Sequence, residues 1–236
     1  MIPCLDDTLS FPPHAQALRE PNGLLAMGGD LSVARLVSAY KQGIFPWFNP
    51  GDPVLWWSPD PRTVLFTDEL HVRRSLDKVL RNRHYQLSFD RCFPDVLAHC
   101  AAATPERPLT WITAEVQAAY LQLHACGIAH SVEIWMEGQL VGGLYGVALG
   151  RMFYGESMFS RANDGSKIAL VHLTRHLAQA GFTMIDCQMW TAHLASLGAR
   201  SISRDEFLAK VRVATAQPAP ATLWTERVHS HEPSRR

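Results

Sequence analysis

Three strand-length segments in the middle of the chain constrain its fold more than any other feature. They cover residues 131–136, 140–148 and 152–159, and short connections containing Gly138 and Gly150 separate them. Connections this short join neighbouring antiparallel strands, because parallel strands need a crossover of a dozen residues or more. The sequence therefore predicts an antiparallel meander at the centre of the fold.

Helices and further strands flank this meander on both sides. Ser32 is a good N-cap for a helix that Gly43 ends, and Thr113 begins a second helix that ends at Gly127. The order of elements predicts a mixed α/β (α+β) protein with a largely antiparallel sheet, and by fold alone it resembles an acetyltransferase-like (GNAT-like) domain. The other predicted elements are strands at 85–89 and 182–190, and helices over 72–81, from 94, over 165–180 and 193–197, and from 203.

The composition changes along the chain and predicts three parts. Residues 1–62 are rich in Pro, Gly and Trp, which predicts a small N-terminal domain with short elements. Residues 63–215 carry the alternating elements and predict an acetyltransferase-like domain, which the family resemblance described below implies to be the catalytic domain. Residues 216–236, rich in Ala, Pro and Gln and then polar, predict a loosely ordered C-terminal tail.

Composition also limits the cellular compartments in which the protein is expected. With 47% hydrophobic and 19% charged residues, the 236-residue chain has a globular balance, and its formal net charge is zero. The start lacks the features of a secretory signal, and no apolar run approaches the ~18–20 residues that cross a bilayer. Five cysteines without a Cys-x-x-Cys pair argue against disulfides and structural zinc, and 11 histidines show no metal-ligand spacing. We expect a cytoplasmic protein without membrane contact, metal or cofactor.

Two strand-like segments carry polar residues among apolar ones. Asp186 and Gln188 interrupt an apolar segment at i and i+2, so strand alternation places both on one face. A buried polar pair is either a structural hydrogen-bond pair of the core or part of a functional site, and the spacing favours neither. Glu156 lies beside apolar residues of another strand; the alternative to a functional role is a solvent-facing position on an edge strand.

Two groups of side chains are candidates for contact with a nucleic acid. Arg74, Lys78 and Arg81 form a basic stripe on one predicted helix face, which either follows a phosphate backbone or is an ordinary solvated face. Several aromatic residues either stack on bases or pack in the core. They are Trp47, Phe48, Trp56, Trp57, Trp111 and Tyr120.

Two phosphate-binding loops are missing from the sequence. No Gly-x-x-x-x-Gly-Lys-Ser/Thr loop occurs, which argues against a P-loop nucleotide site. The pyrophosphate loop of coenzyme-A acetyltransferases has its nearest match at residues 139–144, which lack the final small residue and fall early in a strand. The sequence thus gives no site for either cofactor.

A series of unusual blocks resembles the leucyl/phenylalanyl-tRNA–protein transferase family over residues 18–213. Each block is long or odd in composition, and the blocks occur in the family's order. They are REPNGLLAMGGDLS at 19–32, YKQGIFPWF at 40–48, WWSPDPR at 56–62, TWI at 110–112, HSVE at 130–133, LVGGLYG at 140–146, GESMFS at 155–160, SK at 166–167, DCQ at 186–188 and ASLGA at 195–199.

The resemblance implies an aminoacyltransferase that moves Leu or Phe, and also Met, from aminoacyl-tRNA to proteins beginning with Arg or Lys, which marks them for N-end rule degradation. It implies that Asp186 and Gln188 are the catalytic pair: they orient the amine, and Asp186 accepts or relays its proton. Glu156 supplies negative charge in the acceptor region. The basic stripe meets the tRNA, no cofactor takes part, and the protein is expected to be a monomer.

The resemblance also implies the substrate-binding residues. Leu144 and Leu173 stand where other members carry Met and Phe, which leaves the ranking of donors open. The expected donor pocket and surrounding aromatics are Leu144, Phe153, Met158, Leu170, Leu173, Tyr40, Trp47, Trp111 and Tyr120.

Two rival functions remain at this point. A coenzyme-A-dependent N-acyltransferase shares the expected fold but needs the missing pyrophosphate loop. A non-catalytic tRNA-binding protein accounts for the basic stripe and the aromatics but gives Asp186 and Gln188 no role.

Overall fold

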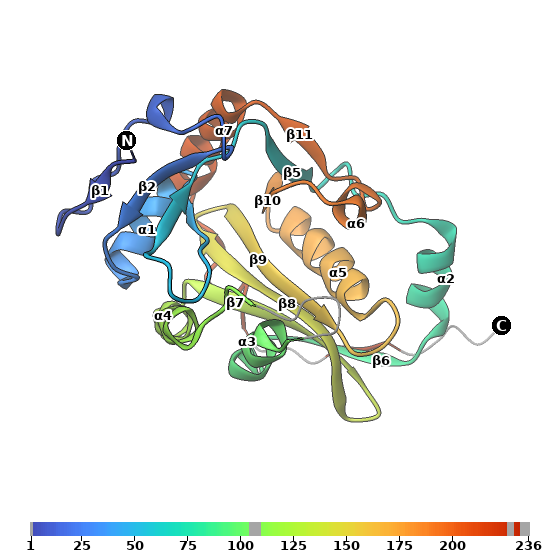
Figure 1. Ribbon diagram of the computed structural model, residues 1–236. Helices are drawn as coiled ribbons and strands as arrows, with labels where there is room; N and C mark the ends of the chain where they lie inside the picture. The colour runs from blue at the N-terminus through green and yellow to red at the C-terminus, as the bar shows by residue number, and fades with distance from the viewer. Residues whose placement is uncertain (1, 104–109, 226–228, 232–236) are drawn as a thin grey trace.

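The computed structural model describes residues 2–103, 110–225 and 229–231, and its centre is an eight-stranded sheet (Figure 1). The strand order is β11-β5-β10-β9-β8-β7-β6-β12, and among the described strand pairs of this sheet only β9 and β10 run parallel. The prediction of a mixed α/β protein with a largely antiparallel sheet is confirmed. The strands are β5 (Arg62–Phe66), β6 (Tyr85–Phe89), β7 (Ala129–Met136), β8 (Gln139–Leu149), β9 (Met152–Ser160), β10 (Met184–Gln188), β11 (Arg200–Ile202) and β12 (His229–His231).

The central meander forms as its spacing predicts. β7 pairs with β8 from Ala129↔Val147 to Met136↔Gln139, and β8 pairs with β9 from Gly142↔Ser160 to Leu149↔Met152. Gly138 has φ +75° in the turn between β7 and β8, a conformation that glycine adopts without strain.

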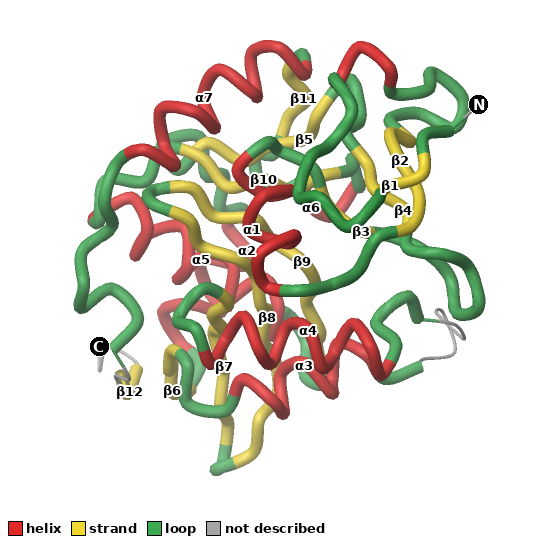
Figure 2. The backbone as a smooth tube through the Cα atoms, turned by 90° about the vertical axis from the view of Figure 1, so that its left-hand side faces the viewer, coloured by secondary structure: helices red, strands yellow, loops and turns green. Residues whose placement is uncertain are grey.

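Strand alternation divides the core into two hydrophobic clusters on the two faces of the sheet. Tyr145 and Tyr154 belong to one cluster, and their neighbours Leu144 and Phe153 belong to the other. Helices α3 (Phe93–Ala101) and α4 (Ala114–Ala125) pack in the first cluster, and α5 (Gly165–Gln179) packs in the second. Figures 1 and 2 show the sheet between these helices.

Side-chain caps begin several helices where the sequence predicts them. Ser32, Thr113 and Ser203 each accept a hydrogen bond from the backbone N–H three residues later. The start of α5 lies so close to β8 that a Cβ on Gly142 would be 2.6 Å from the backbone of Gly165. The remaining helices are η1 (His14–Gln16), α1 (Val33–Lys41), α2 (Arg74–Asn82), α6 (Ala192–Ala195) and α7 (Arg204–Ala216).

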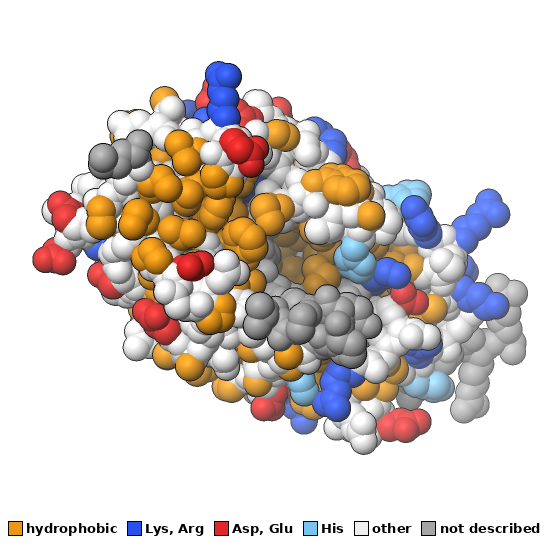
Figure 3. All heavy atoms as spheres, in the orientation of Figure 1, with side chains coloured by type: hydrophobic (Ala, Val, Ile, Leu, Met, Phe, Trp, Pro, Cys, Tyr) orange, Lys and Arg blue, Asp and Glu red, His pale blue; other side chains and the backbone are white. Residues whose placement is uncertain are grey.

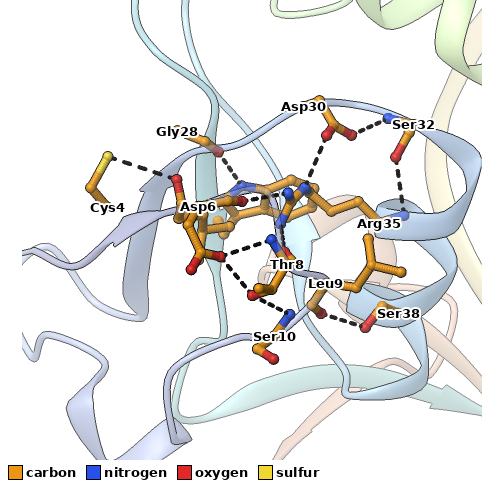
Figure 4. Close-up of polar contacts among 12 residues, drawn as sticks. Cys4, Asp6, Thr8, Leu9, Ser10, Gly28, Asp30, Ser32, Arg35 and Ser38 are labelled. Carbon is orange, nitrogen blue, oxygen red and sulfur yellow. Dashed lines mark hydrogen bonds and ion pairs between the residues drawn. The ribbon is translucent and has the colours of Figure 1, made fainter.

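A second sheet of four short strands forms the N-terminal lobe. Its order is β1-β2-β4-β3, with strands of two to five residues. The buried Arg35 of α1 ties the first segment to this lobe, since its guanidinium donates to the backbone oxygens of Thr8 (2.8 Å) and Asp6 (2.7 Å) (Figure 4). The strands are β1 (Cys4–Leu5), β2 (Leu24–Gly28), β3 (Phe45–Pro46) and β4 (Leu55–Trp57).

The segment after residue 215, for which composition predicts a loose tail, makes specific contacts where it is described. Leu223 is buried, and its backbone oxygen lies 2.9 Å from Nε2 of His176. The Trp224 ring stacks on His130 with centroids 4.2 Å apart. β12 then pairs with β6, while residues 226–228 and 232–236 lie outside the described residues.

In the described parts of the chain, none of the helices combines the length and the apolar character that a membrane span requires.

Candidate active site

A cavity of about 330 Å³ opens where the pairing of β9 with β10 stops. The two strands pair only at Ile185↔Phe153 and Asp186↔Tyr154, after which β9 runs on to Ser160 without β10 beside it. Residues from both strands just beyond this point line the cavity. In Figure 3 a hollow with apolar side chains around it faces the viewer. The sheet thus separates at this point and leaves room for a ligand.

One end of the cavity is apolar. It is formed by buried or partly buried side chains from β8, β9 and α5, which belong to the cluster on the α5 face of the sheet. Burying a Leu or Phe side chain in such surroundings contributes about 1.5–3 kcal/mol. All five residues predicted for the donor pocket lie here, namely Leu144, Phe153, Met158, Leu170 and Leu173.

The other end of the cavity holds the carboxylate of Glu156. Its Oε1 accepts hydrogen bonds from the Tyr40 hydroxyl (2.7 Å) and from the Gln188 side-chain amide (3.0 Å). Its Oε2 accepts from the Tyr120 hydroxyl (2.8 Å). The two tyrosine hydroxyl oxygens are themselves 2.5 Å apart. Glu156 therefore lies in a closed polar network built from α1, α4, β9 and β10.

The electrostatics of this network favour neutral side chains. Burial raises the pKa of Glu156 to about 7, although the hydrogen bonds from both tyrosines act in the opposite direction. Burial first, and the Glu156 charge second, raise the pKa of Tyr40 and Tyr120 well above the ordinary value. Both tyrosines therefore keep their protons near neutral pH, where the Glu156 carboxyl is poised between its two forms.

Asp186 forms an ion pair with Arg62, a residue that the sequence predictions missed. Its Oδ1 and Oδ2 accept from Nε (2.8 Å) and Nη2 (2.6 Å) of Arg62, and both side chains are buried, with 0% and 1% exposure respectively. Such a two-pronged arginine–carboxylate pair fixes geometry as well as charge. The rings of Phe45 and Phe207 lie 4.7 and 4.6 Å from the Arg62 guanidinium carbon.

Gln188 is placed by Asp186 through the backbone. The Gln188 N–H donates to Asp186 Oδ1 (2.8 Å), and Gln188 has φ +60° beside a register shift between the two residues. A non-glycine residue in this region is held there by its surroundings. The side-chain amide then reaches Glu156, so the chain Arg62–Asp186–Gln188–Glu156 is continuous.

The other predicted residues lie at different places. Trp111 lines the cavity, whereas Trp47 is 38% exposed, packs against Trp57 with ring centroids 5.6 Å apart, and does not line it. The basic stripe lies on α2, exposed, and Arg81 forms an ion pair with Asp77 at 2.5 Å.

Sequence reasoning missed several residues that meet the cavity. Thr191, His193 and Leu194 line it from the start of α6, and Cys187 lines it from β10. Arg62 belongs to the WWSPDPR block, so the sequence contained a signal for it, but no spacing connects it with Asp186.

The arrangement suits an apolar group that carries a reactive carbonyl, held next to a carboxylate and an amide that can receive an amine. Within residues 2–103, 110–225 and 229–231, no cluster of three or more His, Cys, Asp or Glu side chains could hold a metal ion.

Comparison with known proteins finds one family over most of the chain. A family model described as leucyl/phenylalanyl-tRNA protein transferase matches residues 64–212, and a model of that protein's N-terminal domain matches residues 29–60. The leucyl/phenylalanyl-tRNA–protein transferases of Laribacter hongkongensis and Chromobacterium violaceum are 60% and 57% identical over 234 residues, covering 99% of this chain and 100% of each relative. Among solved structures, a GCN5-related N-acetyltransferase from Kribbella flavida aligns with a TM-score of 0.34 at 11% identity, over 71% of this chain and 60% of that one.

Proposed function

Since this chain belongs to the leucyl/phenylalanyl-tRNA protein transferase family, as two family models and full-length relatives show, we propose that it performs the reaction which that name describes. In this proposal it transfers Leu or Phe, and also Met, from aminoacyl-tRNA to the α-amine of proteins beginning with Arg or Lys. The new peptide bond marks those proteins for N-end rule degradation.

The observation that carries the proposal is the composition of the cavity. Its apolar end has room for a Leu, Phe or Met side chain and offers no charge to a polar one. Glu156 and Gln188 line its polar end and contact each other, which supports a role for both beside the reacting carbonyl and amine. An apolar pocket separates donors that differ by one methylene by only about 1–3 kcal/mol, so transfer of several apolar amino acids is expected.

The roles of the polar residues follow from their contacts. Asp186 accepts two hydrogen bonds from Arg62 and one from the Gln188 backbone, and these contacts support the proposal that Asp186 and Gln188 together orient the amine. The Gln188 amide nitrogen is used by Glu156, which leaves the amide oxygen to accept from the amine. Glu156 supplies negative charge for the cationic N-terminal residue of the acceptor.

The reaction needs alignment more than strong acid–base chemistry. The donor is an activated ester, and an unperturbed α-amine has a pKa of about 8, so part of it is neutral at pH 7. Holding two substrates in line can supply as much as ~7–11 kcal/mol of the rate acceleration. The fixed geometry of Gln188 and the donor pocket is suited to that task.

The remaining parts of the proposal concern partners. The exposed stripe of Arg74, Lys78 and Arg81 supports contact with the tRNA backbone. The family models, which end at residue 60 and begin at 64, support a division into an N-terminal domain over 1–62 and a catalytic domain over 63–215. We further propose that the protein acts as a monomer in the cytoplasm.

One experiment tests the proposal directly. Purified protein is mixed with radiolabelled leucyl-tRNA and a peptide beginning with Arg, and label entering the peptide is followed. A peptide beginning with Gly and a ribonuclease-treated sample are the controls. Transfer to the Arg peptide that ribonuclease abolishes is the expected result. Acylation supported by acetyl-coenzyme A in place of leucyl-tRNA would overturn the proposal in favour of the coenzyme-A rival.

A further inference from the structure

Three oxygen-bearing side chains at the polar end of the cavity form a closed triangle. Tyr40 contacts Glu156 Oε1 at 2.7 Å, Tyr120 contacts Glu156 Oε2 at 2.8 Å, and the two tyrosine oxygens are 2.5 Å apart. Each distance is that of a hydrogen bond between oxygens. We call this set the Glu156–tyrosine ring.

When Glu156 is ionised, the Glu156–tyrosine ring has one proton fewer than it has O···O contacts. Three O···O contacts need three protons, but two tyrosine hydroxyls supply only two when Glu156 is ionised. When Glu156 is protonated, its O–H can donate to one tyrosine, that tyrosine to the other, and the second back to the free Glu156 oxygen. The ring then has one proton for every contact. It therefore offers a fully hydrogen-bonded place for one additional proton.

Among the titratable groups around the Glu156–tyrosine ring, Glu156 is the one suited to accept the additional proton. Asp186 also lines the cavity, but both of its oxygens accept from the charged guanidinium of Arg62, and a proton placed there would leave that buried charge without its counter-charge. The hydrogen-bond partners of Glu156 are all neutral. Among the other groups that surround the ring, the Gln188 amide is not titratable. Burial raises the pKa of Cys187 and Tyr154, which keeps both protonated near neutral pH. The ring of Tyr145 packs against that of Tyr120, with centroids 5.4 Å apart. Glu156 lines the cavity itself, so a ligand can reach its carboxylate.

We propose that the Glu156–tyrosine ring is the proton acceptor of the reaction, taking the proton that the acceptor's α-ammonium must lose before it attacks. This inference rests on the proposed function and assigns a step within it. The burial that raises the pKa of Glu156 to about 7 makes its carboxylate a competent base for an ammonium whose unperturbed pKa is about 8.

The step balances as follows. The α-ammonium transfers one proton to Glu156, whose carboxylate becomes a carboxylic acid. The resulting amine lone pair forms the C–N bond with the ester carbonyl, and the C–O bond to the tRNA 3′ oxygen breaks. That oxygen leaves with the second nitrogen proton as a hydroxyl. Glu156 afterwards returns its proton to solvent.

The test compares two acceptors in wild type and in Glu156→Gln, by single-turnover transfer from radiolabelled leucyl-tRNA at pH 7. One peptide begins with Arg; the other carries an aminooxy group in place of its α-amine, which is neutral at this pH and has no ammonium proton to lose. We expect Glu156→Gln to slow transfer to the first acceptor by up to about tenfold, because only about a tenth of an amine of pKa ~8 is neutral at pH 7, and to leave transfer to the second acceptor within about twofold of wild type. Equal slowing of both acceptors would overturn the inference.

Conservative tyrosine variants give a second test that does not depend on Glu156→Gln. In Tyr40→Phe and Tyr120→Phe the carboxylate loses one donor, so the acid limb of the pH–rate profile should move upward by about one pH unit. Tyr85→Phe is the matched control, because it removes a tyrosine hydroxyl that contacts His172 and takes no part in the Glu156–tyrosine ring. It should leave the acid limb of the pH–rate profile unchanged. An unmoved limb in both ring variants would contradict the inference. Absence of transfer by the wild type to any acceptor would instead overturn the proposed function.

Discussion

Replacing Arg62 by Met should destabilise the protein strongly, because it leaves the Asp186 carboxylate buried without its partner. The two hydrogen bonds are 2.8 and 2.6 Å long, and both side chains are almost fully buried. Breaking a buried pair of this kind by removing one member costs about 3–5 kcal/mol. The two cation–π contacts of the guanidinium, with Phe45 and Phe207, add about 0.5–2 kcal/mol each at most.

A loss of about 4–9 kcal/mol is a large share of the ~5–15 kcal/mol by which most domains are stable. For a chain of this size it corresponds to a fall in Tm of roughly 10–35 °C. Urea unfolding followed by circular dichroism at constant pH measures the free energy of unfolding.

The double variant Arg62→Met with Asp186→Asn separates the ion pair from simple loss of packing. Because it removes both charges, it should be more stable than the sum of the two single losses predicts, with a coupling of about 2 kcal/mol or more. Strict additivity of the two single effects, or a loss below ~1 kcal/mol for Arg62→Met, would refute the reasoning.

The remaining predictions address the cap, the basic stripe, the donor pocket and the pH dependence of stability. Ser32→Ala should cost about 1 kcal/mol in urea unfolding, because the Arg35 N–H loses its capping oxygen; no change would mean that solvent replaces the cap. Neutralising Arg74 and Lys78 should raise the KM for aminoacyl-tRNA and lower the slope of log affinity against log salt by about 1–2, and an unchanged slope would make the stripe an ordinary solvated face. Leu173→Ala should lower transfer of Leu and Phe and destabilise the fold by about 2–5 kcal/mol, since the side chain is 0% exposed; donor competition and thermal unfolding measure the two effects. Between about pH 5 and 7 the folded state holds a proton on Glu156 that the unfolded state has released, so stability should fall as pH rises through this window. In Glu156→Gln the free energy of unfolding, measured at several pH values, should vary less with pH across this window. If the pH dependence is the same in the variant, another group is responsible for it.

The parts of the fold that the sequence predicts well are those encoded locally. The meander from β7 to β9 follows from alternation and from turns at Gly138 and Gly150. The caps at Ser32 and Thr113 need only the next three residues. Short strands such as β11 and β12 carry no periodic signal of their own, and they form because a neighbouring edge is available for pairing.

The candidate site is only partly visible in the sequence, because its contacts join distant positions. Arg62 and Asp186 are 124 positions apart, and Tyr40 and Tyr120 are 80 apart, so no spacing rule can connect them. Simple alternation also fails at the end of β10, where the register shift and the positive φ of Gln188 set the direction of its side chain. The residue types were recognisable by their resemblance to family blocks, whereas the ion pair between Asp186 and Arg62 required the structure.

The position of β10 in the strand order has a consequence for synthesis on the ribosome. β5 and β9 are made well before β10, which is the strand that lies between them. A nascent chain that ends before residue 184 therefore leaves β9 with an unpaired edge, and it leaves β5 without either of its neighbours, β10 and β11, for the time needed to translate the rest. Such edges are prone to pairing with other chains. The contact between β5 and β10 spans well over a hundred residues, which makes its formation slow relative to the local meander. Because Arg62 lies on β5 and Asp186 on β10, we expect their ion pair to form late in folding, and a fragment released before residue 186 cannot contain it.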